Sequence, residues 1–165
     1  MTTRRLSTSK QESAADQTPL SASGAELKAR ALRLLARREH SRAELARKLA
    51  PHAESFVLLE KLLSELESRK QLSEERFAEG RARLLSRKYG AAHIRHDLKS
   101  KGVADEVIDR VSSEGELERA RAILERKYRQ PATTREELAK RMRFLQSRGF
   151  SYEIIRSALS TTDDR

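Results

Sequence analysis

The sequence predicts an all-α protein in which three tandem three-helix repeats form an elongated, curved molecule behind a disordered N-terminal tail. Six glycines and three prolines among 165 residues leave few of the breaks that a β-rich chain needs. Aromatic residues make up only 4% of the chain, so its cores must consist mainly of Leu, Ile, Val and Ala. A motif of two aliphatic residues, one variable residue and two basic residues also recurs, as "LLARR" (34–38), "LLSRK" (84–88) and "ILERK" (123–127). This recurrence indicates a repeat architecture.

Residues 1–24 form the predicted tail. They are rich in Ser, Thr, Gln and Ala and show no apolar periodicity. Such a segment cannot bury enough apolar surface to offset the entropy that it would lose on folding. We therefore expect this segment to be disordered and helical structure to begin near Ala25.

The first repeat is predicted over residues 25–70. Its first helix follows from apolar residues spaced for one helical face, namely Leu27, Ala31, Leu34 and Leu35. Ser41 and Glu44 form a capping box that opens the second helix, and Pro51 closes it. The apolar segment "SFVLLEKLLSELES" (55–68) is the third helix.

The second and third repeats are predicted over residues 71–112 and 113–160. Ser73, followed by two glutamates, indicates a helix start, because acidic residues favour the positive end of the helix dipole. Further along, "LKSKGVADEVIDRV" (98–111) aligns with "LQSRGFSYEIIRSA" (145–158), and in each a glycine ends the second helix of its repeat. Each repeat alone is too small for a robust core, so neighbours should stack end to end.

The charge balance favours a polyanionic partner. The chain carries 35 Lys and Arg against 25 Asp and Glu, a formal net charge of +10. Such an excess attracts nucleic acid, an acidic protein surface or an anionic membrane. The absence of cysteine fits a reducing compartment, and neither a membrane-spanning stretch nor a hydrophobic signal core is recognisable. We expect a cytoplasmic protein without a membrane partner.

Catalysis and metal binding find little support. The sequence has no nucleophile elbow, Walker loop, Rossmann glycine pattern or metalloprotease helix. His93 and His96 could share one helix face, but Asp97 is the only further ligand nearby, so ordinary half-exposed helix residues are the simpler interpretation. We expect no enzymatic activity, no metal and no cofactor.

The basic residues are the better candidates for a functional surface. A single arginine on a helix often only solubilises it, but a basic pair that recurs at one place in each repeat indicates a stripe that faces a partner. Arginine suits this role because its planar guanidinium can bind carboxylate or phosphate through two hydrogen bonds. The predicted partner-binding residues are Arg33, Arg37, Arg38, Arg83, Arg87, Lys88, Arg95, Lys99, Lys101, Arg126 and Lys127.

Contact with nucleic acid should involve phosphates rather than bases. Tyr89 and Tyr128 follow the basic pairs of the second and third repeats, and each is better explained as a cap on a core than as a stacking platform. Phosphate contacts of this kind are sensitive to salt.

A helix-turn-helix transcriptional regulator is the alternative. "HSRAELARKLA" (40–50) resembles the first helix of such a unit, and residues 55–68 would then have to read bases. That segment is mostly apolar and acidic, whereas a recognition helix needs donors directed at base edges. It has the composition of a packing helix.

Three segments carry a family resemblance: "REHSRAELARKL" (38–49), "LSEERFAEGRARLLSRKYGAAHIRHDLKSKGV" (72–103) and "RMRFLQSRGFSYEIIRSAL" (141–159). With these, residues 27–160 resemble the RecX family, the regulatory proteins of the RecA recombinase. The resemblance implies tandem three-helix repeats and a non-catalytic modulator that lies in the groove of the RecA filament on single-stranded DNA. It also implies that the ATP hydrolysis, strand exchange and coprotease activities of RecA are reduced. The expected protein is a monomer, and RecA is its partner.

The sequence departs from the family pattern at two turns. Lys70 stands where a glycine usually precedes the second repeat, and "APHAES" (50–55) replaces the usual Lys-Gly turn. Both departures concern local backbone geometry rather than the expected activity.

Overall fold

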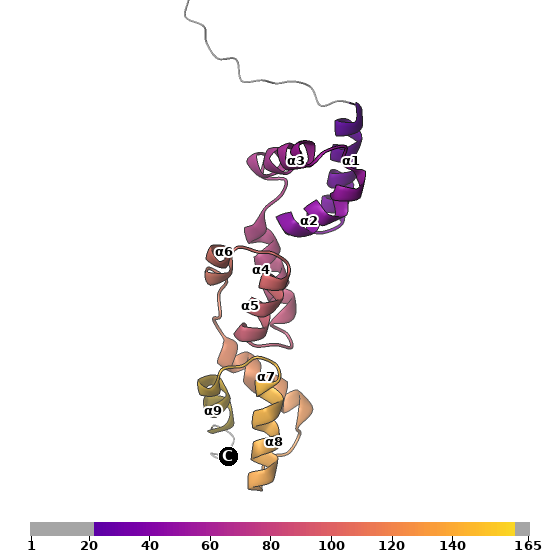
Figure 1. Cartoon of the computed structure of the whole chain (residues 1–165). Coiled ribbons are helices and arrows are strands. Elements are labelled where there is room, and N and C mark those ends of the chain that lie inside the picture. The colour runs from indigo at the N-terminus through magenta and orange to yellow at the C-terminus, as the bar shows by residue number, and fades with distance from the viewer. Residues whose placement is uncertain (1–21, 161–165) are drawn as a thin grey trace, which may run out of the picture.

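A computed structural model describes residues 22–160, and every regular element in that range is helical. The elements are α1 (Ala22–Arg37), α2 (Arg42–Leu49), the 3-10 helix η1 (Ala50–His52), α3 (Phe56–Ser68), α4 (Glu74–Leu85), α5 (Ala91–Ser100), α6 (Asp105–Asp109), α7 (Glu116–Lys127), α8 (Arg135–Gln146) and α9 (Tyr152–Ser160). Figure 1 shows α1–α3, α4–α6 and α7–α9 as three groups stacked along one axis. We call them the first, second and third repeats. The predicted all-α, elongated repeat architecture is confirmed.

The first helix begins slightly earlier than expected. α1 starts at Ala22, inside the segment 1–24 that we predicted to be disordered. The rest of that segment lies outside the described residues.

Each repeat has a core of its own. The first consists mainly of leucines, and Leu72 completes it from beyond the end of α3. The second core is built around Phe77, Ile94 and Leu98. The third is built around leucine, isoleucine and Phe150. Helices pack mainly within their own repeat, and the repeats meet through turns and helix starts.

Side-chain hydroxyls open five of the described helices. A backbone N–H three residues later donates to each of these hydroxyls, which belong to Ser41, Ser55, Ser73, Thr134 and Ser151. These bonds satisfy N–H groups that the helix itself leaves unpaired. The predicted capping box at Ser41 forms only in part, because the Glu44 carboxylate pairs with Arg38.

Three helices end in the same kind of left-handed turn. Lys70, Gly102 and Gly149 have φ angles of 56°, 74° and 79°, and the N–H of the following residue donates to a carbonyl five residues back. This is the Schellman motif, in which glycine normally occupies the left-handed position. Among the described residues, Lys70 is the only residue other than glycine with a positive φ. The lysine therefore adopts the left-handed backbone conformation that glycine adopts at the other two turns.

The glycine turn of the second repeat docks on the first repeat. Ser41 Oγ donates to the carbonyl of Lys101 at 2.6 Å, while also capping α2. The turn lies so close that a Cβ on Gly102 would come within 2.6 Å of the Ala43 Cβ. We call this contact the first joint.

The third repeat docks on the second in the same way, at what we call the second joint. The N–H of Gly90 donates to the carbonyl of Arg148 at 2.8 Å, and the N–H of Ala91 donates to the buried carboxylate of Glu116 at 2.8 Å. A Cβ on Gly149 would lie 2.5 Å from the backbone nitrogen of His93. In both joints a glycine turn thus meets the start of the second helix of the preceding repeat.

The repeated joint gives a reason for the unusual turn of the first repeat. There α2 runs into η1, which contains Pro51, instead of ending at a glycine. Within residues 22–160 no repeat precedes the first one, so this turn docks on nothing and does not need the close approach that glycine allows.

We predict that Gly149→Ala lowers the free energy of unfolding by about 3 kcal/mol, because the methyl group meets backbone atoms at a positive φ. Gly80→Ala is the matched control, since its Cβ would meet nothing within 4 Å. Gly80 lies inside α4, where alanine should add up to about 1 kcal/mol of stability. Urea unfolding measures both values, and equal effects of the two substitutions would contradict the close contact.

We predict that Lys70→Gly raises the free energy of unfolding by about 0.5–1 kcal/mol, because it removes the cost of a side chain at a left-handed position. Lys61→Gly, in an exposed position inside α3, should instead destabilise by about 1 kcal/mol. Urea unfolding compares the two, and a loss of stability in Lys70→Gly would refute the strain.

Candidate functional site

An open cavity of about 370 Å³ lies at the second joint. Five of its lining residues are cations, and the other three are apolar or aromatic. The second repeat contributes Arg87, Lys88 and Tyr89, and the third contributes Ile123, Arg126, Lys127, Phe144 and Arg148. We call it the joint cavity. Four of its five cations belong to the basic pairs predicted from the sequence.

These cations lie at or just after the carboxyl ends of three helices. Arg87 and Lys88 follow the end of α4, Arg126 and Lys127 end α7, and Arg148 lies in the turn after α8. Basic residues favour this position, because the carboxyl end of a helix carries roughly half a negative charge. Three such ends offset only part of five positive charges, so the cavity keeps a positive excess.

Aromatic rings hold two of the cations in position. The Arg148 guanidinium lies 4.5 Å from the centre of the Phe144 ring and 5.7 Å from that of Tyr89, and its Nη1 donates to the carbonyl of Lys88 at 3.0 Å. The Lys127 ammonium lies 4.1 Å from the Phe144 ring centre. Cation–π contacts of this kind fix a charge without neutralising it. The Tyr89 ring also stacks on the His93 ring, with 3.9 Å between the ring centres.

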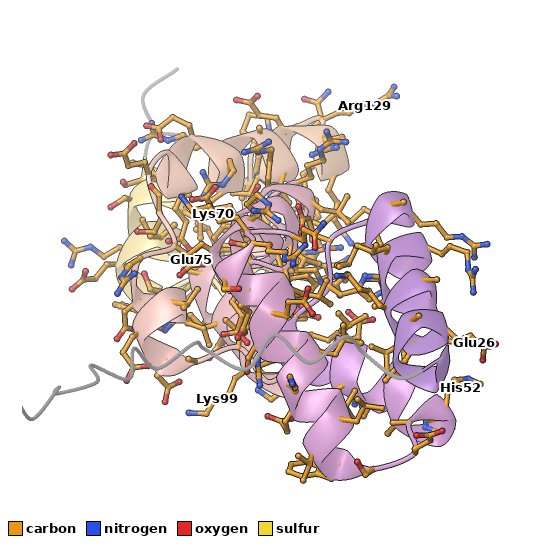
Figure 2. All side chains as sticks on the ribbon, turned by 90° about the horizontal axis from the view of Figure 1, so that it is seen from above. Glu26, His52, Lys70, Glu75, Lys99 and Arg129 are labelled. Carbon is orange, nitrogen blue, oxygen red and sulfur yellow. The ribbon has the colours of Figure 1, made fainter. Side chains whose placement is uncertain are left out.

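The five cations have no carboxylate partner among residues 22–160. Charged side chains project from all sides of the stack, with Lys99 and Arg129 on opposite sides in Figure 2. The cavity is therefore distinguished by the absence of lining carboxylates rather than by basic residues alone.

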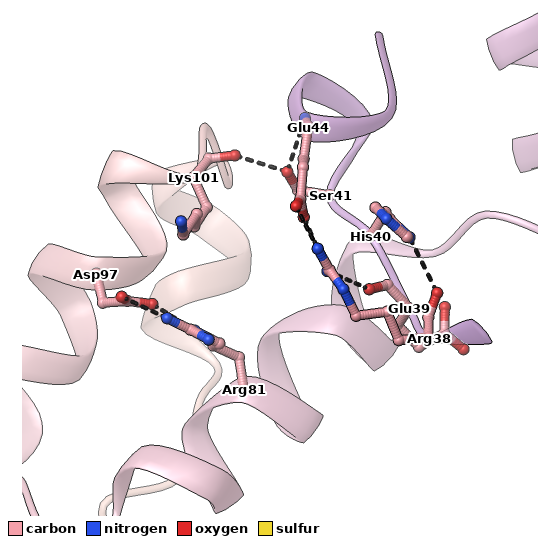
Figure 3. A network of polar contacts seen from close by, with 8 residues as sticks. All are labelled: Arg38, Glu39, His40, Ser41, Glu44, Arg81, Asp97 and Lys101. Carbon is pink, nitrogen blue, oxygen red and sulfur yellow. Dashed lines mark hydrogen bonds and ion pairs between the residues drawn. The ribbon is translucent and has the colours of Figure 1, made fainter. Parts of the chain in front are cut away.

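The first joint shows the opposite arrangement (Figure 3). There Arg38 binds Glu44 at 2.5 Å, and Arg81 binds both oxygens of Asp97 at 2.7 and 2.8 Å. Hydrogen bonds from the two guanidinium groups lower the pKa of both carboxyl groups. Arg38 and Arg81 are thus neutralised within the protein, and the Lys101 charge also acts on Asp97.

The repeat alignment relates the two joints residue by residue. The shift that aligns 98–111 with 145–158 pairs Lys101 with Arg148 and Asp97 with Phe144. An aromatic ring therefore occupies in the third repeat the position of a neutralising carboxylate in the second.

The other predicted residues are scattered. Three of them form ion pairs on the surface: Arg38 with Glu44, Arg95 with Asp109 and Lys99 with Asp105. Arg33 and Arg37 are exposed on α1, and Lys101 lies at the first joint. Arg83 lines a second cavity of about 280 Å³ together with Arg110 and Arg119. The structure thus brings together four of the eleven residues, Arg87, Lys88, Arg126 and Lys127.

Sequence reasoning missed Arg148 and Phe144. The repeat alignment was the available signal, because it pairs Arg148 with Lys101, which was on the predicted list. Which cations come together across the joint depends on how the repeats stack.

His40 is a buried titratable group beside the first joint, with a side chain 2% exposed. Its Nδ1 lies 2.9 Å from the carbonyl of Arg38 and donates to it, which leaves a bare, buried Nε2 without a partner. Burial lowers the pKa of this imidazole, and nearby Arg38 and Lys48 act in the same direction, while the Arg38 carbonyl and Glu44 oppose them.

We predict that His40 makes stability depend on pH. A lowered folded-state pKa means that the unfolded chain binds the proton more tightly. The stabilisation is fully present above the unfolded pKa of about 6.5 and is lost as the pH falls through the lowered folded-state value. Urea unfolding between about pH 7.5 and pH 5 should show this loss.

His40→Asn should remove the pH dependence, because an amide can still donate to the Arg38 carbonyl but does not titrate. His52→Gln, at an exposed position, is the matched control and should retain it. If the free energy of unfolding of His40→Asn depended on pH as in the unsubstituted protein, the prediction would be contradicted.

The fold and the cavity define a class, the helical proteins built from tandem three-helix repeats. Family models for the first, second and third three-helix domains of RecX match residues 28–52, 73–111 and 114–159. The chain belongs to the RecX family of regulatory proteins.

Relatives named regulatory protein RecX are similar over most of the chain. One from Leptothrix cholodnii is 46% identical over 140 residues, which cover 83% of this chain and 89% of the relative. One from Herbaspirillum seropedicae is 46% identical over 138 residues, which cover 82% and 90%.

The fold is also that of solved RecX structures. The crystal structure of RecX from Lactobacillus salivarius aligns with a TM-score of 0.78 at 20% identity, covering 87% of this chain and 99% of that one. A second crystal structure of a regulatory protein RecX aligns at 0.69 with 22% identity, covering 81% and 70%. In the part of the chain that the structure describes, no helix is long and apolar enough to cross a membrane.

Proposed function

We propose that this protein is a non-catalytic modulator of the RecA recombinase, and mainly an inhibitor. It binds the groove of the RecA filament on single-stranded DNA and lowers ATP hydrolysis, strand exchange and coprotease activity in recombination, DNA repair and the SOS response. The proposal places it in the cytoplasm as a monomer. Membership of the RecX family and the family resemblance support this role.

The joint cavity is the observation that carries the proposal. A filament on DNA presents phosphates and protein carboxylates, and five unneutralised cations on one surface would attract both. The molecule is also elongated (Figure 1), so it could contact more than one RecA subunit at once. A ligand that spans subunits resists the changes in their relative orientation that ATP hydrolysis requires.

The lining of the cavity suits binding rather than chemistry. Cations, two aromatic rings and one isoleucine form it, and no carboxylate, histidine, serine or cysteine lines it. General acid–base and nucleophilic catalysis usually depend on such groups. The cavity can hold an anion, and its residues offer no obvious base.

We predict that the double substitution Arg87→Glu and Lys88→Glu weakens inhibition of the DNA-dependent RecA ATPase at least tenfold in inhibitor concentration. Each charged contact contributes about 1.5–3 kcal/mol. Even if half of the energy of two lost contacts were compensated, the remainder would exceed the roughly 1.4 kcal/mol that corresponds to a tenfold change. The double substitution Lys61→Glu and Lys140→Glu changes the net charge equally, and both lysines are exposed outside the cavity. Inhibition that is equal in the two variants would refute the joint cavity as the contact surface.

The same titration, run beside binding to bare DNA, tests the alternative of a helix-turn-helix regulator. Such a regulator would show sequence preference for duplex DNA without RecA. The position of α3 argues against it: its leucines are buried in the first core, and its Glu60 and Glu67 both bind Arg42.

A further inference from the structure

We propose that the joint cavity binds phosphate groups, and that this binding draws the second and third repeats together. The inference deepens the proposed function, on which it rests for the biological role of the cavity, by naming the ligand and the response of the protein. The binding itself requires no RecA.

Both repeats contribute cations that repel each other across the joint. Arg87 and Lys88 belong to the second repeat, whereas Arg126, Lys127 and Arg148 belong to the third. The carboxylate of this joint, Glu116, accepts from the N–H of Ala91 and does not line the cavity. An anion between the two groups would therefore replace repulsion across the joint by attraction from both sides.

The first joint serves as an internal comparison. The same glycine turn meets the same part of the preceding repeat there, but Glu44 and Asp97 already neutralise Arg38 and Arg81 (Figure 3). A joint whose two arginines are already paired with carboxylates gains less from an external anion. We therefore expect phosphate to draw repeats together at the second joint and not at the first.

The chemistry of the lining favours phosphate over a carboxylate. Three of the five cations are arginines, whose planar donors bind two oxygens of a phosphate at once. A single carboxylate brings one charge, while a nucleic-acid strand brings one charge with every nucleotide and a polyphosphate brings several. The source can be a strand or a free polyphosphate, since both present the same group.

Arg148 links the cavity to the geometry of the joint. Its carbonyl accepts the N–H of Gly90, its side chain donates to the carbonyl of Lys88, and its guanidinium lines the cavity. Helices otherwise pack mainly within repeats, so the angle between the second and third repeats depends on the contacts at this glycine turn, and Arg148 makes two of them. A ligand that holds Arg148 and Lys88 together therefore fixes the orientation of the third repeat.

The chain contains no cysteine, so a pair of spin labels can be placed without removing native thiols. Glu106→Cys with Glu136→Cys spans the second joint at exposed positions of α6 and α8. Ser64→Cys with Glu106→Cys spans the first joint and is the control. Pulsed electron paramagnetic resonance measures each distance distribution with tripolyphosphate, with an oligodeoxythymidylate, and with polyglutamate.

We expect tripolyphosphate, the oligonucleotide or both to narrow the distribution across the second joint and to leave the first joint unchanged. A response to either supports phosphate binding, and the ligand that responds identifies the source. No narrowing, equal narrowing at both joints, or an equal response to polyglutamate would overturn the proposal. RecA is not present, so this result is independent of the ATPase test.

A pair of charge reversals locates the binding. Arg126→Glu brings a carboxylate into the cavity from an exposed position and should weaken the binding of tripolyphosphate or the oligonucleotide about tenfold. Arg129→Glu changes the net charge equally but lies outside the lining, and its effect should stay within about twofold at moderate salt. Equal weakening by both substitutions would mean that the whole basic surface binds, which would overturn a site at the joint.

Discussion

The close approach of a glycine turn to the start of a neighbouring helix is the constraint on which this structure depends. Three small cores cannot fix their own arrangement, because most helix packing occurs inside each repeat. Gly102 and Gly149 allow backbone and hydroxyl hydrogen bonds to form directly between repeats at distances that a side chain would block. The stacking, and with it the composition of the joint cavity, follows from these two contacts.

The two joints show how one backbone design can support different surfaces. Glu44 and Asp97 neutralise Arg38 and Arg81 at the first joint. At the second joint Phe144 occupies the position aligned with Asp97, and five cations surround an open cavity. A carboxylate would have cancelled charge there, whereas a ring holds Lys127 and Arg148 in place without cancelling it. The two joints of this chain thus differ in charge more than in backbone geometry.

Much of the fold could be predicted from local signals. Serine caps, apolar spacing and the recurring glycine determined where helices begin and end, since each acts over a few residues. The signals failed where a side chain had two possible partners. Glu44 follows the capping pattern, yet its carboxylate binds Arg38, because an ion pair across the α1–α2 corner was available only after folding.

By itself, the sequence determined the helical class, the repeats, the basic pairs and the likeness to RecX proteins, because all of these depend on composition and on the spacing of residues along the chain. Only the tertiary structure decided which cations meet. It brought Arg87 and Lys88 next to Arg126 and Lys127, paired Arg95 and Lys99 with carboxylates, and added Arg148 and Phe144. The reason is physical: the ion pairs depend on how helices pack inside one repeat, and the meeting of the four predicted cations depends on how two repeats stack at a glycine turn.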